Sequence, residues 1–245
     1  MRVEPYRQDH HGQGRCWPPP AFAQTLVSRT RLDNVHHCIE TVLGENVPGD
    51  FIEAGVWRGG VGILMRAVLA ANHIDDRTVW LADSFAGLPA PNPSAYPADR
   101  DADFHEYDEL AVPIDVVKDA FRRYGLLDEH VEFVPGWFNQ TLPKLRNHRW
   151  ALVRVDADMY ESTSDALAYL YPGLASGGFV IIDDYVHEPC RRAVEDFRTS
   201  FGIEDEIHRI DWAAAYWRRS ATLDESAPGN EQPRSGGGLD SQDGA

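Results

Sequence analysis

The amino-acid sequence predicts an α/β fold, with a mostly parallel sheet and helices on both of its faces. Stretches of helical periodicity alternate with short apolar stretches along most of the chain. Several apolar stretches are continuous runs of Val, Ile, Leu and Phe, as in strands that are buried on both faces of a parallel sheet. Three of them end in aspartates. Together these features predict a layered α/β domain.

The first half of the chain is predicted to begin with a helix over residues 21–42. Leu32, Val35, Ile39 and Val42 recur there at three- and four-residue spacings, and a Pro-Gly pair then breaks the pattern. The next elements are a strand over residues 50–55, a helix over 60–72 and a strand over 78–82 that runs into Asp83.

A long loop, residues 84–107, separates the two halves. It is rich in Pro, Asp and Ala, and loops longer than about 12–15 residues are usually lids or disordered segments. The elements predicted after it are a helix over residues 113–124, strands over 131–134 and 150–155, a helix over 164–174, a strand over 179–182, a helix over 189–201 and strands over 206–210 and 215–218.

The two ends of the chain differ from this pattern. Residues 1–24 are predicted to be irregular. Residues 221–245 are rich in Gly, Ser, Asp, Glu and Pro and contain no aromatic residue, which predicts a disordered acidic tail. The predicted domain is therefore residues 25–220.

The overall charge excludes some classes of partner. The formal net charge is −16 over 245 residues, and so acidic a protein repels nucleic acid and anionic membranes. No apolar run reaches the roughly 18–20 residues that span a bilayer, and the polar first residues lack the apolar region of a secretory signal. The three cysteines are scattered, which disfavours a disulfide framework or a zinc site. We therefore expect a cytoplasmic protein.

A glycine-rich turn leaves the strand at residues 50–55 and opens the next helix. Glycines let a backbone approach a ligand closely, and a helix N-terminus offers free N–H groups to anionic groups. The spacing G-x-x-x-G-G differs from the dinucleotide-binding G-x-G-x-x-G. An acid two residues before the first glycine, here Glu53, is typical of enzymes that use S-adenosylmethionine. Asp83 ends the next strand, where an acid can accept hydrogen bonds from ribose hydroxyls. The alternative is a tight turn that binds nothing.

Aspartates gather where two later strands end. Asp156 and Asp158 follow one strand, and Asp183 and Asp184 follow another. Carboxylates this close destabilise one another unless something neutralises them. They are hard oxygen ligands, suited to Mg²⁺, Ca²⁺ or Mn²⁺. A cation there could hold a substrate hydroxyl, and Asp156 is the candidate for both ligand and general base. Asp158 could instead cap a helix or turn.

Seven segments resemble the macrocin O-methyltransferase family, which modifies sugars on macrolides and related natural products. The strings Gly-Val-Trp-Arg-Gly-Gly and Asp-x-Asp-x-Tyr-Glu-Ser-Thr are the most specific. The segments are Pro48–Gly60, Ala82–Pro89, Arg123–Asp128, Pro135–Phe138, Asp156–Thr163, Gly177–Tyr185 and Tyr216–Arg219. The resemblance covers about residues 25–220, and the family often has Gly where this chain has Ala157.

The resemblance implies a class I methyltransferase sheet of seven strands with the last reversed. It implies S-adenosylmethionine as the donor, Mg²⁺ bound by Asp156, Asp183 and Asp184, Asp156 as the base, and the loop over residues 84–107 as a lid. It also implies a glycosylated small molecule as the acceptor and a homodimer or higher homo-oligomer. The expected cofactor-binding residues are Glu53, Ala54, Gly55, Val56, Trp57, Gly59, Asp83, Ser84, Gly136, Trp137 and Asp156.

Two other functions fit parts of the sequence. A catechol-like acceptor would use the same metal chemistry on adjacent aromatic hydroxyls, and a cavity rim lined with aromatic residues would favour it. A cofactor-binding scaffold without catalysis is the second, and the intact aspartates argue against it.

Overall fold

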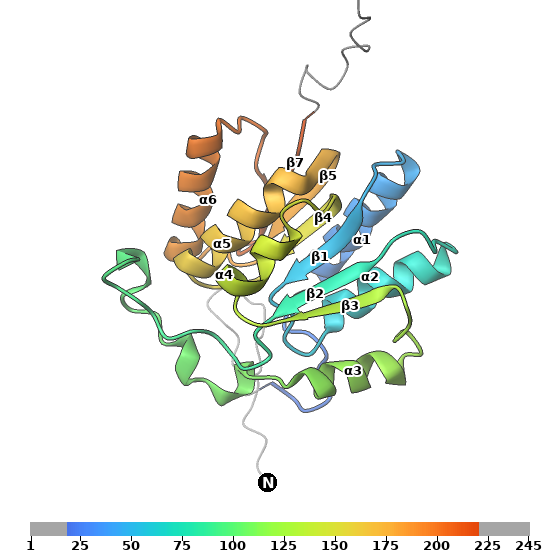
Figure 1. The fold of residues 1–245 in the computed structure, drawn as a ribbon, viewed down its shortest axis with the longest axis horizontal. Coiled ribbons are helices and arrows are strands. Elements are labelled where there is room, and N and C mark those ends of the chain that lie inside the picture. Colours follow the sequence, from blue (N-terminus) through green and yellow to red (C-terminus); the bar gives the residue numbers. More distant parts are fainter. Residues whose placement is uncertain (1–18, 221–245) are drawn as a thin grey trace, which may run out of the picture.

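The computed structural model describes residues 19–220, which form one layered α/β unit (Figure 1). The segments 1–18 and 221–245, for which irregular structure and a disordered tail were predicted, lie outside the described residues. A seven-stranded sheet has the order β3-β2-β1-β4-β5-β7-β6. The pairings among β1 to β5 are parallel, whereas β7 runs antiparallel to β5 and to β6. The predicted fold class is confirmed.

The elements follow one another as the alternating pattern predicts. In chain order they are α1 (Arg29–Gly44), β1 (Asp50–Ala54), α2 (Gly60–Ala71), β2 (Val79–Asp83), α3 (Ile114–Arg123), β3 (Val131–Pro135), α4 (Phe138–Thr141), β4 (Trp150–Val155), α5 (Tyr160–Leu170), β5 (Leu174–Ile182), α6 (Glu188–Phe201), β6 (His208–Arg209) and β7 (Ala215–Arg218). Among these helices, none has the length and apolar character needed to cross a membrane.

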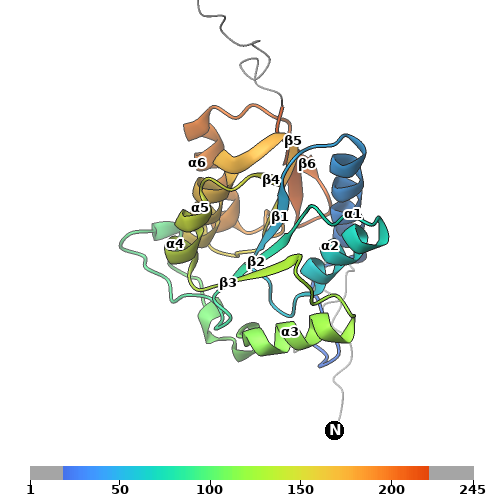
Figure 2. The same ribbon diagram turned by 45° about the vertical axis from the view of Figure 1, so that its right-hand side comes forward.

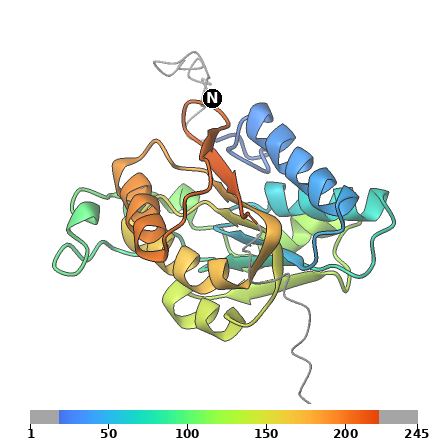
Figure 3. The same ribbon diagram turned by 90° about the horizontal axis from the view of Figure 1, so that it is seen from above.

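The sheet separates two apolar cores, because successive side chains of a strand point to opposite faces. Phe51 and Leu152 pack under α1, α2 and α3, whereas Ile52 and Val153 pack under α5 and α6. Figures 2 and 3 show these two helical layers on either side of the twisted sheet. The strands are therefore buried on both faces, which is why they are continuously apolar.

The helix predicted from residue 21 begins only at Arg29. Ser28 has an extended backbone (φ −68°, ψ 159°), and its hydroxyl accepts a hydrogen bond from the backbone N–H of Arg31 at 3.3 Å. A serine in this role marks the start of a helix. Residues 19–27 form an irregular segment instead, which we call the strap. The carbonyl of Gln24 in the strap accepts a hydrogen bond from the N–H of Gly60 at 2.9 Å.

The prediction for α5 is wrong at both ends. The helix starts at Tyr160 rather than residue 164, and a 3-10 turn over Tyr171–Gly173 replaces its predicted end. Pro172 sits in that turn, where it cannot continue the α-helical hydrogen bonding. β5 then begins at Leu174, before the predicted residue 179, although its first half contains two glycines that disfavour a strand. The short helix α4 was not predicted.

The loop predicted over residues 84–107 continues to residue 113, and we call residues 84–113 the lid. It contains three 3-10 helices, Pro97–Asp99, Phe104–Glu106 and Asp108–Leu110. The lid runs past the edge of the sheet toward which the arrowheads of β1, β2 and β3 point (Figure 1).

Candidate functional site

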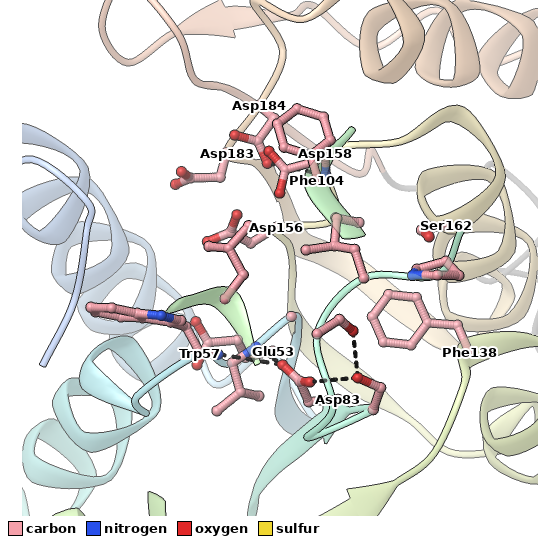
Figure 4. Close-up of a pocket in the computed structure, with 18 of the residues that line it drawn as sticks. Glu53, Trp57, Asp83, Phe104, Phe138, Asp156, Asp158, Ser162, Asp183 and Asp184 are labelled. Carbon is pink, nitrogen blue, oxygen red and sulfur yellow. Dashed lines mark hydrogen bonds between the residues drawn. The ribbon is translucent and has the colours of Figure 1, made fainter. Parts of the chain in front are cut away.

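A cavity of about 600 Å³ opens at the carboxyl ends of the parallel strands, beneath the lid. Its walls come from the segments that follow β1, β2, β3, β4 and β5, from the lid, and from the first turns of α5. Open α/β sheets bind their ligands at this edge. In Figure 4, Glu53, Trp57 and Asp83 lie on one side, and Asp156, Asp158, Asp183 and Asp184 lie on the other.

The glycine turn after β1 is fixed by its neighbours. Gly55 has φ +92°, and a Cβ placed there would lie 1.8 Å from the carbonyl oxygen of Asp156. Only glycine allows the ends of β1 and β4 to approach this closely. The next residues are held by Asp83, whose Oδ2 accepts hydrogen bonds from the N–H groups of Val56 (2.6 Å) and Trp57 (3.3 Å).

Asp83 therefore shapes the turn as well as facing the cavity. Its other oxygen, Oδ1, accepts a hydrogen bond from the N–H of Phe85 at 2.8 Å. Burial raises the pKa of Asp83, and the three backbone N–H groups oppose that rise. The hydroxyl of Ser84 donates to the carbonyl of Gly87 at 2.6 Å and so closes the first turn of the lid.

Glu53 is buried in the floor of the cavity, with a relative exposure of 1%. Burial raises its pKa to about 8, against the opposing effect of the Arg154 guanidinium. Its Oε2 makes no well-formed hydrogen bond within the described residues, although the backbone N–H of Gly62 lowers the pKa of the carboxyl group. Buried acceptors are normally hydrogen-bonded, so this oxygen calls for a donor from a ligand.

Arg154 joins three carboxylates at the centre of the site. Its guanidinium donates to Glu53 at 2.7 Å, to Asp156 at 2.9 Å and to Asp183 at 2.6 Å. Burial lowers the pKa of Arg154, but the carboxylates of Asp183, Asp156 and Glu53 outweigh it and raise the pKa overall. Arg31, from α1, holds the second oxygen of Asp183 at 2.5 Å. Two arginines thus fix the orientation of Asp183.

Asp184 is a buried carboxyl group that no arginine of this cluster contacts. Burial raises its pKa well above the ordinary range, and the carboxylates of Asp158, Asp156 and Asp183 raise it further. Carboxylate oxygens of Asp156, Asp183 and Asp184 lie within 4.8 Å of one another, as do ligand atoms of Asp158, Asp184 and His187. Hard oxygen donors at this separation fit a divalent cation such as Mg²⁺.

The structure brings most of the predicted site residues to one cavity. Those that line it are Glu53, Gly55, Val56, Trp57, Asp83, Ser84, Gly136, Trp137, Asp156, Asp183 and Asp184. Ala54 and Gly59 are not among its lining residues. Ala54 packs in the core beneath α5 and α6. Gly59 has φ +83°, and a Cβ there would lie 2.8 Å from Cγ1 of Val117, so both residues support the turn from outside the cavity.

Several lining residues were not predicted from the sequence. Thr25, Leu26 and Val27 reach the cavity from the strap that had been assigned to a helix. Arg154 had a visible signal, because a charged residue inside a continuous apolar strand must find a partner. Glu161 and Ser162, which also line the cavity, belong to the Asp156–Thr163 motif but were given no role, and Asp165 had no signal.

Comparisons with known proteins agree with this geometry. The family model described as Macrocin-O-methyltransferase (TylF) matches residues 1–219. A Streptomyces olivaceus protein, named as the 4'-O-methyltransferase of 8-demethyl-8-(2,3-dimethoxy-alpha-L-rhamnosyl)-tetracenomycin-C, is 51% identical over 85% of this chain and 79% of its own. The mycinamicin III 3''-O-methyltransferase of Micromonospora griseorubida is 47% identical over 82% of this chain and 81% of its own.

The solved structure of the O-methyltransferase NovP superposes with a TM-score of 0.81 at 48% identity, covering 83% of this chain and 85% of that one. Each similarity spans both the glycine turn and the aspartate cluster in a chain with the class I methyltransferase sheet order. This chain belongs to the macrocin O-methyltransferase family, and it is an O-methyltransferase.

Proposed function

We propose that this O-methyltransferase transfers the methyl group of S-adenosylmethionine to a sugar hydroxyl of a glycosylated natural product, with the help of Mg²⁺. One observation carries the proposal: a single cavity joins the glycine turn and Glu53 to the cluster of Asp156, Asp183 and Asp184. The names of the Streptomyces and Micromonospora relatives support a glycosidic acceptor.

The residues around the glycine turn fit the cofactor. Glu53 offers a buried acceptor that lacks a well-formed hydrogen bond, which suits the ammonium or a hydroxyl of S-adenosylmethionine. Gly55 keeps the floor of the cavity free of side-chain atoms, and Asp83 lies where ribose hydroxyls can reach it. Trp137 and Phe138 supply rings on which adenine could stack.

The acidic cluster fits Mg²⁺, which Asp156, Asp183 and Asp184 would hold. When bound, the cofactor supplies an electrophilic methyl group, and the metal ion favours the alkoxide of the hydroxyl it contacts. Asp156 takes the proton of that hydroxyl, because its side chain is the most accessible of the carboxylates around Arg154, at 31% exposure. The cavity walls align the oxygen with the methyl group for an in-line displacement.

We call the part of the cavity beside the end of β4 and the first turns of α5 the acceptor half; polar side chains line its α5 wall, and the ring of Phe138 lies next to Ser162 there (Figure 4). Asp158, Glu161, Ser162 and Asp165 line it, and the ring of Phe104 lies beside this wall. Sugars present many hydroxyls and few apolar atoms, so a polar wall favours a glycoside over a flat catechol. A cytoplasmic homodimer or higher homo-oligomer is the form that we propose for the enzyme.

Calorimetry with S-adenosylhomocysteine on the full chain is the first test, followed by assays of glycosides with Mg²⁺. We expect binding near one-to-one stoichiometry and methyl transfer that EDTA abolishes and Mg²⁺ restores. Absence of binding would contradict the cofactor assignment, and full activity in EDTA would contradict the metal assignment. Preferred turnover of catechols would replace the glycoside with the catechol alternative.

A further inference from the structure

Asp99 is a buried acid within a lid that is otherwise largely exposed. It ends the 3-10 helix Pro97–Asp99, and its relative exposure is 0%. Neighbouring Arg100 and Asp101 are both exposed. Carboxylates are rarely fully buried unless they are paired, so Asp99 must be held by specific donors.

The donors come from the first turn of α5, far along the chain. Oδ1 of Asp99 accepts a hydrogen bond from the N–H of Tyr160 at 2.6 Å, and Oδ2 accepts one from the N–H of Glu161 at 3.0 Å, across 61 and 62 residues. The residue at the N-cap of α5 is Met159, which makes no side-chain capping bond. The first N–H groups of a helix lack partners within it, and a carboxylate there is also stabilised by the helix dipole.

This contact fixes two walls of the cavity against each other. On the α5 side, the capped turn directly follows Asp158 and carries Glu161 and Ser162, which line the cavity. On the lid side, Asp103 and Phe104 follow Asp99 within five residues and also line the cavity, where the ring of Phe104 lies beside Asp158 (Figure 4). In Figure 4, Phe104 and Ser162 lie on the side of the cavity away from Glu53 and Asp83.

The ring of Tyr96 reinforces the same attachment. It lies 6.1 Å from the ring of Tyr160, centroid to centroid. The lid is therefore held to α5 by a ring contact and by two hydrogen bonds to one carboxylate, and the carboxylate is the only one of these groups that satisfies helix N–H donors.

We propose that Asp99 is a positioning residue for the acceptor: by capping α5 from the lid, it sets the width of the acceptor half and keeps the lid closed over it. This inference rests on the proposed methyl transfer to a glycoside. Asp99 is not among the residues that line the cavity beside Glu53 and Asp83. Its loss therefore weakens acceptor use and leaves cofactor binding intact.

The test compares D99A and D99N with D101N, a matched change of an exposed acid on the same lid. We expect D99A to raise the KM for the glycoside acceptor by about tenfold, because the lid and the first turn of α5 are no longer held at a fixed separation. D99N keeps one acceptor oxygen and should fall between D99A and wild type. Affinity for S-adenosylhomocysteine should stay within about twofold in all variants, because Asp99 is not among the residues that line the cavity. D101N should behave as wild type.

Three results would overturn the proposal. An unchanged acceptor KM in D99A would show that the cap does not position the acceptor. A loss of S-adenosylhomocysteine affinity as large as the rise in acceptor KM would show that Asp99 supports the whole structure rather than the acceptor site. Limited proteolysis tests the attachment of the lid without relying on the proposed function. Even if the wild type methylates no glycoside, the lid of D99A should be cleaved faster than that of the wild type, and the lid of D101N should not. Equal cleavage rates would refute the attachment itself.

Discussion

Among the single residues of the site, Asp156 combines two properties that its neighbours do not share. Its side chain is 31% exposed, whereas those of Glu53 and Asp183 are exposed by 2% and 5%. It is also held in place by Arg154. An oriented carboxylate that remains accessible is what a general base requires.

Replacement of Asp156 by Asn tests this role. We expect the rate of methyl transfer to fall by at least about 100-fold, the usual contribution of a positioned general base. Binding of S-adenosylhomocysteine should change little, because the glycine turn and Glu53 remain. Initial rates and calorimetry measure the two effects, with D115N, on the exposed side of α3, as the control. Wild-type turnover by D156N would remove Asp156 from the mechanism.

Asp165, one helical turn after Glu161, predicts a pH dependence of stability. Burial and the nearby Glu161 carboxylate raise the pKa of Asp165 from 3.8 to about 6. Because the folded protein holds this proton more tightly than the unfolded chain, the stabilisation is complete below pH 3.8 and is lost as the pH rises through about 6. Asp165→Asn should therefore raise the melting temperature at pH 8 and leave it nearly unchanged at pH 4. Thermal melts of the wild type and the variant between pH 4 and pH 8 test this prediction. An equal change in melting temperature at both pH values would exclude titration of Asp165 as the cause.

How far the sequence determines a residue's role depends on where its partners are. Asp83, Asp156, Asp183 and Asp184 were predicted because each ends a strand, and strand ends share one edge. Glu161 was not, because the helix was predicted to begin only at residue 164, and Asp165 was not, because nothing in the predicted helix indicates which of its faces meets the cavity.

At the level of elements, the strand-to-helix turns were predicted more accurately than the ends of α1 and α5. Apolar runs and glycines are local signals, and they located β1, α2 and β2 to within one or two residues. The start of α5 depends instead on Asp99, a side chain about sixty residues away, which no periodicity reveals. The strap before α1 has apolar residues at helical spacing, but Leu26 and Val27 line the cavity instead, and the carbonyl of Gln24 accepts a hydrogen bond from the first residue of α2.

The glycine turn gives a prediction at this scale. Gly55→Ala should abolish cofactor binding and lower the melting temperature strongly, because the added Cβ would lie 1.8 Å from a backbone oxygen that cannot move away. Gly125→Ala is the matched control, since it also has positive φ but nothing lies within 4 Å of the added atom. It should cost about 1 kcal/mol. Denaturant unfolding and calorimetry compare the two, and equal effects would mean that backbone strain alone matters at Gly55.

The molecule as a whole carries a formal charge of −16. Part of that charge is concentrated at the carboxyl edge of the sheet, where a bound cation would relieve the repulsion around Asp184. A ligand that binds only the folded state raises the melting temperature by mass action.

Mg²⁺ should therefore raise the melting temperature of the wild type more than NaCl of equal ionic strength does. Asp184→Asn should lose this difference and keep the stabilisation by S-adenosylhomocysteine. Differential scanning fluorimetry distinguishes the two ligands, and equal shifts by both salts would point to general screening of charge.

The ion cluster around Arg154 also constrains how this protein can have changed over time. Losing Arg154 alone would leave three carboxylates without their shared cation, and losing Glu53 or Asp183 alone would leave a buried guanidinium underpaired. Removing one partner of a buried ion pair costs about 3–5 kcal/mol, whereas replacing the whole set with apolar residues can be neutral. We therefore expect each single substitution in the cluster to destabilise the whole protein, and we expect tolerated changes to alter the four positions together.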